Sequence, residues 1–277
     1  MPIMSPSDFV WYKIPTLQKL IFNIMIENNK SIKSAEWLIC NSTYDLEPGA
    51  FTLAPQIVPV GPLLASHRLG DSAAPLWKED SSCLEWLDQQ PPSSVVYIAF
   101  GSSTVLTRTQ FHELAMGLEL ANRPFLWVVR HYGGVENNDF PEGFLERVLK
   151  QGRIIGWAPQ QKVLSHPSIA CFISHCGWNS TVESVSNGVP ILCRPYFADQ
   201  FINQSYICDI WKVGLKFEED TGGMVTSQEI KKKIDELLHD AKFKERALNL
   251  KEKIRISARE GGSSYKNLRD FISWIKE

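Results

Sequence analysis

Short apolar runs alternate with amphipathic segments along most of this chain. Runs typical of buried strands lie at 37–41, 57–60, 95–100, 125–129, 153–156, 168–174, 189–193 and 213–217. Segments with apolar residues at helical spacing lie at 16–30, 83–88, 107–121, 141–150, 179–187, 201–211, 227–238, 241–258 and 265–276. Because strands and helices take turns from residue 95 onward, the sequence predicts an α/β fold with a doubly wound parallel sheet.

The same pattern divides the chain into four parts. Residues 1–65 hold one helix and two strands, and the apolar face of that helix is expected to pack on a sheet. Residues 66–92 are rich in Gly, Ala, Ser and Pro in their first half, which is typical of a linker. Residues 93–260 carry the predicted sheet domain. Residues 261–277 open with a glycine pair and form a last helix, which we expect to pack back on the N-terminal part.

The stretch from residue 157 to residue 200 contains two strand–turn–helix units in series. The strand at 168–174 leads through the turn at 175–178 into a helix that Gly188 can cap and Pro190 cannot continue. In a parallel sheet, the carboxyl ends of strands and the N-termini of the following helices form a crevice with unpaired N–H groups. The sequence therefore predicts a phosphate-binding site at this edge.

Several side chains near this edge have both a functional and a purely structural interpretation. Trp157 follows a strand, where its indole can stack on a base; the structural alternative is a core tryptophan, which is common among the nine in this chain. His175 can donate to a phosphate or be a satisfied core histidine. Gln160 in a first helical turn needs no function at all.

The residues at the start of the second helix have the same double interpretation. Asn179 and Ser180 can bind a diphosphate together with the backbone amides, and they are also common helix-capping residues. Glu183 completes a capping box with Ser180, which competes with a role in contacting ribose hydroxyls.

Charge and hydropathy argue against nucleic-acid binding and against a membrane protein. The net charge of −2 provides no basic surface for nucleic acid or anionic lipid. No apolar run approaches the roughly 18 residues expected of a membrane span. The six cysteines include no CxxC pair, which indicates reduced thiols in a cytoplasmic protein.

Other catalytic patterns are missing from the sequence. It contains no D-x-D pair to carry Mg²⁺, and residues 218–220 are the nearest approach. A Walker loop and a G-x-S-x-G elbow are also absent. The lack of a G-x-G-x-x-G motif argues against a dinucleotide oxidoreductase.

The whole stretch resembles the forty-four-residue signature of plant secondary-product glycosyltransferases, which are family 1 UDP-glycosyltransferases. The similarity runs from Trp157-Ala158-Pro159-Gln160 to Asp199-Gln200 and includes the core at 175–180. The resemblance implies a GT-B fold, in which a doubly wound donor domain faces an N-terminal acceptor domain. It also implies a UDP-sugar co-substrate, no metal or other cofactor, and inverting transfer to a hydroxyl of a small plant metabolite.

The resemblance also implies a role for each matching residue. Trp157 would stack on uracil, and the backbone of Ala158 would bind the edge of the base. Glu183 would bind the ribose, and a closing glutamine at Gln200 favours glucose as the donor sugar. The full set of expected donor-binding residues is Ser102, Trp157, Ala158, Gln160, His175, Gly177, Trp178, Asn179, Ser180, Glu183, Asp199 and Gln200, with Trp178 and Asp199 also at the sugar.

The catalytic base cannot be assigned to this chain. The family takes it from a histidine, oriented by an aspartate, in the N-terminal domain, whereas the first histidine here is His67 in the predicted linker. We therefore expect residues 1–65 to be a remnant of an acceptor domain in a truncated chain that binds UDP with little or no transfer. The alternative is a non-catalytic UDP-sugar-binding or dimerising partner of a full-length glycosyltransferase.

Overall fold

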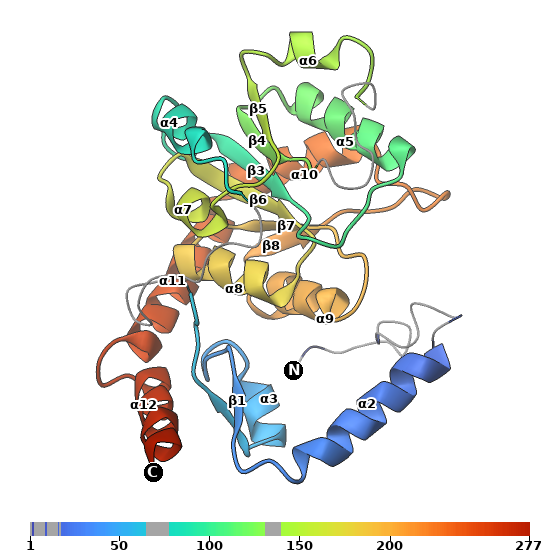
Figure 1. Ribbon diagram of the computed structural model, residues 1–277. Helices are drawn as coiled ribbons and strands as arrows, with labels where there is room; N and C mark the ends of the chain where they lie inside the picture. The colour runs from blue at the N-terminus through green and yellow to red at the C-terminus, as the bar shows by residue number, and fades with distance from the viewer. Residues whose placement is uncertain (1, 3–8, 10–15, 17, 65–77, 131–139) are drawn as a thin grey trace.

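The computed structural model describes residues 2, 9, 16, 18–64, 78–130 and 140–277. Its centre is a parallel six-stranded sheet with the order β5-β4-β3-β6-β7-β8 (Figure 1). The strands are β3 (Val95–Ala99), β4 (Phe125–Val128), β5 (Gly152–Ile155), β6 (Ile169–Ser174), β7 (Ile191–Cys193) and β8 (Gly214–Lys216). The chain winds outward from β3 in one direction and from β6 in the other. This confirms the predicted doubly wound sheet and creates a switch point between β3 and β6.

Helices cover both faces of this sheet. One face packs against α5 (Arg108–Ala121), α6 (Phe144–Arg147) and α10 (Ser227–His239). The other packs against α4 (Ser82–Asp88), α7 (Gln160–Ser165), α8 (Trp178–Asn187) and α11 (Ala241–Ala258) (Figure 1). Strands buried on both faces explain the continuous apolar runs in the sequence.

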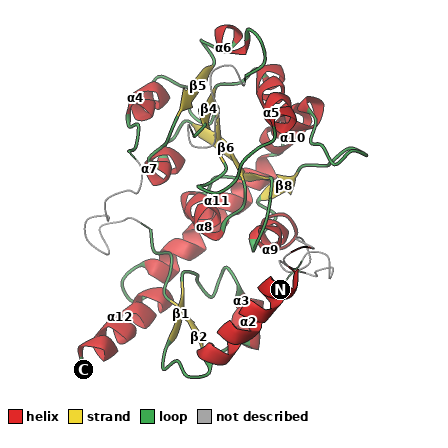
Figure 2. Cartoon of the chain, turned by 45° about the vertical axis from the view of Figure 1, so that its right-hand side comes forward, coloured by secondary structure: helices red, strands yellow, loops and turns green. Residues whose placement is uncertain are grey.

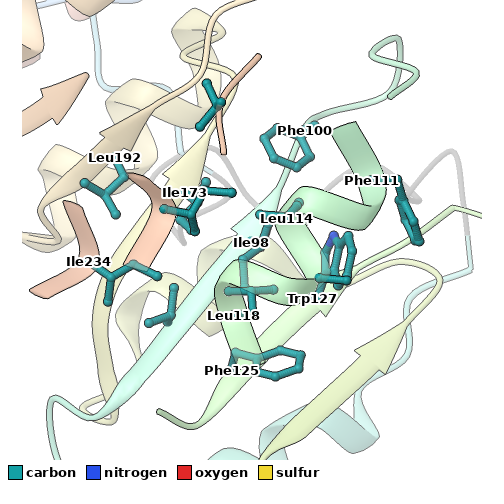
Figure 3. Packing of buried hydrophobic residues seen from close by; sticks show 14 of the residues in the cluster. Ile98, Phe100, Phe111, Leu114, Leu118, Phe125, Trp127, Ile173, Leu192 and Ile234 are labelled. Atoms are coloured by element: carbon teal, nitrogen blue, oxygen red, sulfur yellow. The ribbon is translucent and has the colours of Figure 1, made fainter. Parts of the chain in front are cut away.

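The larger core lies between the sheet and helices α5 and α10. Phe125 and Trp127 of β4 pack there with Phe111 of α5 and Ile234 of α10 (Figure 3). A capping box opens α5: Thr107 Oγ1 accepts from the Gln110 backbone N–H, and the Gln110 side chain accepts from the Thr107 N–H. This box fixes where α5 begins, directly after the loop that follows β3.

A small N-terminal unit, residues 18–64, lies below the sheet domain in Figure 1. It consists of α2 (Gln18–Ile32), β1 (Leu38–Cys40), α3 (Pro48–Leu53) and β2 (Ile57–Pro59), with β1 and β2 paired in parallel. The prediction that the first helix packs on a sheet is wrong here, because none of the described residues of α2 is buried. Leu20 and Ile24 are 56% and 50% exposed. Two short strands offer too little apolar surface to cover such a face.

The last helix, α12 (Ser263–Lys276), runs beside the N-terminal unit (Figure 2). The Asn267 side-chain amide donates to the Pro59 carbonyl of β2 at 2.8 Å. Trp37 packs against Phe271 and Trp274, with ring centroids 5.6 and 6.0 Å apart. The chain thus returns to its own beginning after completing the sheet domain.

Other element boundaries differ from the predictions in ways that have local causes. The helix expected at 141–150 contracts to α6, and the structure adds a short helix, α7, that begins at Gln160 with Pro159 as its N-cap. The segment at 201–211 is divided into α9 (Gln200–Ser205) and a π-helix, η5 (Tyr206–Ile210), a feature that apolar spacing cannot reveal. The short helix α3 is below the length at which periodicity is informative. Parts of the predicted linker and of the loop after β4, residues 66–77 and 131–139, lie outside the described residues.

Among the residues described, no helix combines the length and the apolar character needed to cross a bilayer.

Candidate nucleotide-binding site

The turn between β6 and α8 forms the centre of the site. Cys176 adopts a left-handed conformation with φ of 63°, and its backbone N–H donates to Ser174 Oγ at 3.0 Å. Gly177 is the N-cap of α8, and the first i→i−4 bond runs from Thr181 N to the Gly177 carbonyl at 2.9 Å. The amides of residues 178–180 thus precede the helical ladder, as an anion site at a helix N-terminus requires.

No side chain caps this helix. The alternative that Asn179 or Ser180 serves as a helix cap is therefore wrong in this structure. Asn179 is exposed and Ser180 is buried, so only Asn179 offers its side chain directly to solvent.

His175 lies between two glycines from different strand ends. A Cβ added to Gly101 would be 2.6 Å from His175 Nε2, and one added to Gly177 would be 2.5 Å away. Gly101 also has a φ of +69°, a conformation that other residues rarely adopt. Both glycines are thus required for the loop after β3 to approach the turn after β6, which is the switch point of the sheet.

Electrostatics keep the imidazole neutral at this point. Burial lowers the pKa of His175 below its ordinary value, and this outweighs the opposing effect of the Asp199 carboxylate. The nearby Arg130 guanidinium lowers the pKa further. A neutral imidazole can donate one hydrogen bond to a phosphate oxygen near pH 7.

Arg130, which sequence reasoning missed, holds the loop after β3. Its guanidinium donates to the carbonyl of Ser102 and to that of Thr104, the second at 2.6 Å. The Ser102 side chain is exposed at the tip of this loop. The sequence signal that could have identified Arg130 is a charged residue two positions after the end of β4, at the same edge of the sheet.

Glu183 on α8 is joined to α7 by two glutamine side chains. Gln160 Nε2 donates to Glu183 Oε2 at 2.6 Å and to Ser180 Oγ at 2.9 Å, and Gln161 Nε2 donates to Glu183 Oε1 at 3.1 Å. The capping-box alternative for Glu183 is therefore wrong. Burial raises the pKa of Glu183, and the two amide hydrogen bonds oppose that rise.

The segment that enters α7 carries Trp157 and Ala158. Trp157 follows β5 and remains partly exposed, unlike the core residue Trp127 at 1%. Its carbonyl accepts from the Asp80 N–H at 2.8 Å, which fixes the backbone beside α4. Ala158 is 6% exposed and packs with Val163 of α7.

The loop after β7 folds around its own closing residues. Gln200 is 3% exposed, and its Oε1 accepts from the backbone N–H groups of Tyr196 and Phe197 at 2.7 and 3.0 Å. Asn203 Nδ2 donates to Asp199 Oδ2 at 2.7 Å and to the Cys176 carbonyl at 2.8 Å. Asn203, also missed from the sequence, thus ties this loop to the turn that carries His175.

Trp178 points toward the N-terminal unit. Its indole N–H donates to the Asn41 carbonyl at 2.7 Å, so in this structure its polar atom is engaged there and not toward a sugar. Trp211 makes a similar contact with the same unit, because its indole N–H donates to the Leu46 carbonyl at 2.9 Å. Trp178 and Trp211 thereby join the sheet domain to the N-terminal unit.

Two loops and a helix N-terminus meet at the switch point of the parallel sheet, which is where doubly wound proteins commonly bind nucleotides. Within the described ranges, no group of three or more His, Cys, Asp or Glu side chains is placed to hold a metal ion. The groups gathered at this edge are amide, imidazole, hydroxyl and carboxylate, which suit a nucleoside diphosphate.

Comparison with known proteins identifies the family. The model described as "UDP-glucoronosyl and UDP-glucosyl transferase" matches residues 24–255. Among curated relatives, UDP-glycosyltransferase 83A1 of Arabidopsis thaliana is 48% identical over all of this chain and 59% of its own length. Flavonol 3-O-glucosyltransferase UGT76E12 of the same plant is 37% identical, over 98% of this chain and 60% of its own.

Solved structures agree with this result. Os79 from O. sativa in complex with UDP superposes with a TM-score of 0.88 at 32% identity, covering 98% of this chain and 62% of that one. Phytolacca americana UGT2 complexed with UDP-2fluoro-glucose and pterostilbene gives a TM-score of 0.87 at 34% identity, over 100% and 64% of the two chains. The chain belongs to the plant family 1 UDP-glycosyltransferases and has the GT-B fold. It spans about 60% of the length of the relatives it matches.

Proposed function

We propose that this chain binds UDP-glucose along the carboxyl edge of the six-stranded sheet. As part of a glycosyltransferase, it would present the sugar for inverting transfer to a hydroxyl of a small plant metabolite. The observation that carries the proposal is the uncapped start of α8 facing His175 between Gly101 and Gly177. The UDP-bound state of the solved relative Os79 supports the choice of nucleotide.

The diphosphate is assigned to the start of α8. The amides of residues 178–180 supply donors and the positive end of the helix dipole. His175 and the Asn179 side chain add donors, and Ser102 adds one from the loop after β3. The Ser180 hydroxyl accepts from Gln160, which leaves its own O–H to donate toward the phosphates.

The nucleoside is assigned to the segment around α7. Trp157, partly exposed after β5, would stack on uracil, and the backbone of Ala158 would bind its edge. Glu183 would accept from the ribose hydroxyls, with Gln160 beside it. These roles follow the order of the segments across the sheet edge, from β5 through α7 to α8.

The donor sugar is assigned to the loop after β7. The Gln200 amide oxygen is engaged by its own loop, so we assign sugar contact to the amide nitrogen. Asp199 would accept from sugar hydroxyls, and Trp178 would contribute its ring, since its N–H is bound to Asn41. Glucose remains our choice of sugar.

This arrangement stabilises the leaving group with groups that the chain itself provides. Negative charge that develops on UDP during transfer would be stabilised by the α8 amides and by His175. The start of α8 and His175 would take the place of a metal ion. Activation of the acceptor hydroxyl requires a base within hydrogen-bond reach, and the sequence has no histidine before His67. We therefore expect the 277-residue polypeptide alone to bind UDP and to transfer little.

Calorimetry with UDP, UDP-glucose and UDP-galactose, followed by a turnover assay on phenolic acceptors, tests this proposal. We expect UDP binding, tighter binding of UDP-glucose than of UDP-galactose, and little product. His175→Ala should weaken UDP binding, whereas His239→Ala, at the far end of α10, should not. Unchanged UDP affinity in His175→Ala would refute the site, and rapid turnover would refute the missing-base hypothesis.

A further inference from the structure

A chain of oriented hydrogen bonds leads from the centre of the sheet to Glu183. It begins at Tyr97, the middle residue of β3, which is 1% exposed. The Tyr97 ring stacks on Phe172 of β6 with centroids 4.8 Å apart, so the neighbouring strand fixes its position. Its hydroxyl donates to Gln160 Oε1 at 3.1 Å.

The direction of every bond in this chain is determined by Glu183. An ionised carboxylate only accepts, so Gln160 must turn its NH₂ group toward Glu183 and its carbonyl toward Tyr97. Tyr97 must then be the donor in its bond to Gln160. Burial, and secondarily the charge of Glu183, raises the pKa of Tyr97 well above its ordinary value, so the phenol keeps its proton.

The hydrogen-bonding groups of Gln160 and Glu183 differ in how many remain available to a ligand. Both N–H groups of Gln160 are used, one by Ser180 Oγ and one by Glu183 Oε2, so this amide has no N–H left for a ligand. The Glu183 carboxylate has about four acceptor positions, and two are taken by Gln160 and Gln161. Two acceptor positions remain, which is the number that a vicinal diol can fill.

We propose that Tyr97 is a positioning residue for ribose recognition: acting through Gln160, it orients Glu183 to accept from both ribose hydroxyls of the nucleotide. This inference rests on the proposed binding of UDP at this edge. It assigns Gln160 to the support of Glu183 and not to ligand contact. It also explains why a hydroxyl-bearing side chain lies in the middle of an otherwise apolar strand, where phenylalanine would pack equally well.

The test compares UDP with 2′-deoxy-UDP, which lacks one of the two hydroxyls. Calorimetry on the wild-type chain should show a clear preference for UDP. In Tyr97→Phe, UDP should bind about 2- to 10-fold more weakly, as expected for the loss of one supporting hydrogen bond, while 2′-deoxy-UDP changes much less. A purely structural role for Tyr97 would weaken both ligands equally and leave their ratio unchanged.

Two further variants keep the test decisive. Gln160→Met breaks the same chain from its other side and should reduce the UDP preference equally, with little added loss in the double variant. Tyr206→Phe removes a hydroxyl from a tyrosine that is 3% exposed and packs on Trp211, and it should leave the preference intact. Thermal melting verifies that each variant is folded.

Each outcome has a distinct meaning. A reduced preference in both Tyr97→Phe and Gln160→Met supports the inference. The inference is overturned if folded Tyr97→Phe keeps the full preference for UDP over 2′-deoxy-UDP. It is also overturned if the wild-type chain binds UDP but shows no such preference. In both cases the proposed binding of UDP at this edge stands. Failure of the wild-type chain to bind UDP overturns both.

Discussion

The sheet domain and the N-terminal unit are encoded by similar apolar periodicity but differ sharply in burial. All five residues of β3 are buried, whereas no described residue of α2 is. The α2 sequence still repeats apolar residues at helical spacing. Periodicity therefore identifies the face that a partner would cover, and the tertiary structure decides whether the described chain covers it.

The largest expected difference between the two regions is in stability. Phe125 of β4 is 0% exposed, and Phe22 of α2 is 45% exposed. We expect Phe125→Ala to lower the free energy of unfolding by about 3–5 kcal/mol, because it removes a buried ring and leaves a cavity. Phe22→Ala should change it by no more than about 0.5 kcal/mol.

Urea titration followed by tryptophan fluorescence measures both values. Comparable losses in the two variants would mean that α2 is packed as tightly as the sheet, and the difference in burial between the two regions would then carry no difference in stability.

The second expected effect concerns the site on the sheet domain. Gly101→Ala would place a Cβ 2.6 Å from His175 Nε2 and should weaken UDP binding about 10- to 100-fold, as for the loss of a hydrogen bond to a charged group. Gly223→Ala is the matched control. Gly223 has a similar φ of +77°, but its added Cβ would meet only Glu219, at 3.9 Å. Both substitutions strain the backbone, and only the first reaches His175.

Calorimetry with UDP, together with a melting curve for each variant, separates affinity from folding. Equal losses of UDP affinity in Gly101→Ala and Gly223→Ala would show that backbone strain, and not the approach to His175, controls binding.

The third effect uses two buried carboxylates, one in each region. Burial raises the pKa of Glu183 in the sheet domain and of Glu47 in the N-terminal unit. If ionised Glu183 accepts from the ribose, uridine affinity should fall as the pH drops through the raised pKa, by up to about tenfold per pH unit. Uridine lacks the diphosphate, so protonation of His175 does not oppose this trend.

Titration of uridine by NMR between neutral and acidic pH provides the measurement. Glu183→Gln should remove the pH dependence, and Glu47→Gln should leave it unchanged because the Glu47 carboxylate accepts from Ser42 within the N-terminal unit, away from the proposed ribose position. A pH dependence that survives in Glu183→Gln would assign the titrating group elsewhere.

The sequence was most informative where local chemistry and periodicity coincide. The strands from β3 to β8 and the start of α5 were predicted close to their observed positions, because each depends on neighbouring residues. The resemblance also indicated the correct family and a GT-B fold. Short-range sequence patterns were therefore enough to predict the doubly wound sheet.

Features created by long-range contacts could not be predicted from the sequence. Tyr97 and Gln160 are joined across 63 positions, and no spacing rule connects them. The same applies to Arg130, which reaches the carbonyl of Ser102 across 28 positions. Local spacing also suggested a capping box for Glu183, a choice that the tertiary contacts with Gln160 and Gln161 override.

The smallest expected effect lies at the contact between the two regions. Leu46 is 0% exposed and packs with Cys176 and Val185 of the sheet domain, and its carbonyl accepts from Trp211. Trp211→Phe keeps an aromatic ring but removes the N–H. The free energy that holds residues 41–47, the docked segment, against the sheet domain should therefore fall by about 0.5–1.5 kcal/mol. Hydrogen exchange of the amides in the docked segment should then accelerate about 2- to 10-fold.

Trp274→Phe is a control on the other side of the N-terminal unit, because its ring contacts with Trp37 and Phe271 do not require an N–H. Mass spectrometry of peptides covering 41–47 should show acceleration in Trp211→Phe and not in Trp274→Phe. Exchange in α5 should be unaffected in both variants. Acceleration spread equally over α5 and the docked segment would mean that Trp211 supports the whole fold, because a local contact between the two regions would release only the segment it holds.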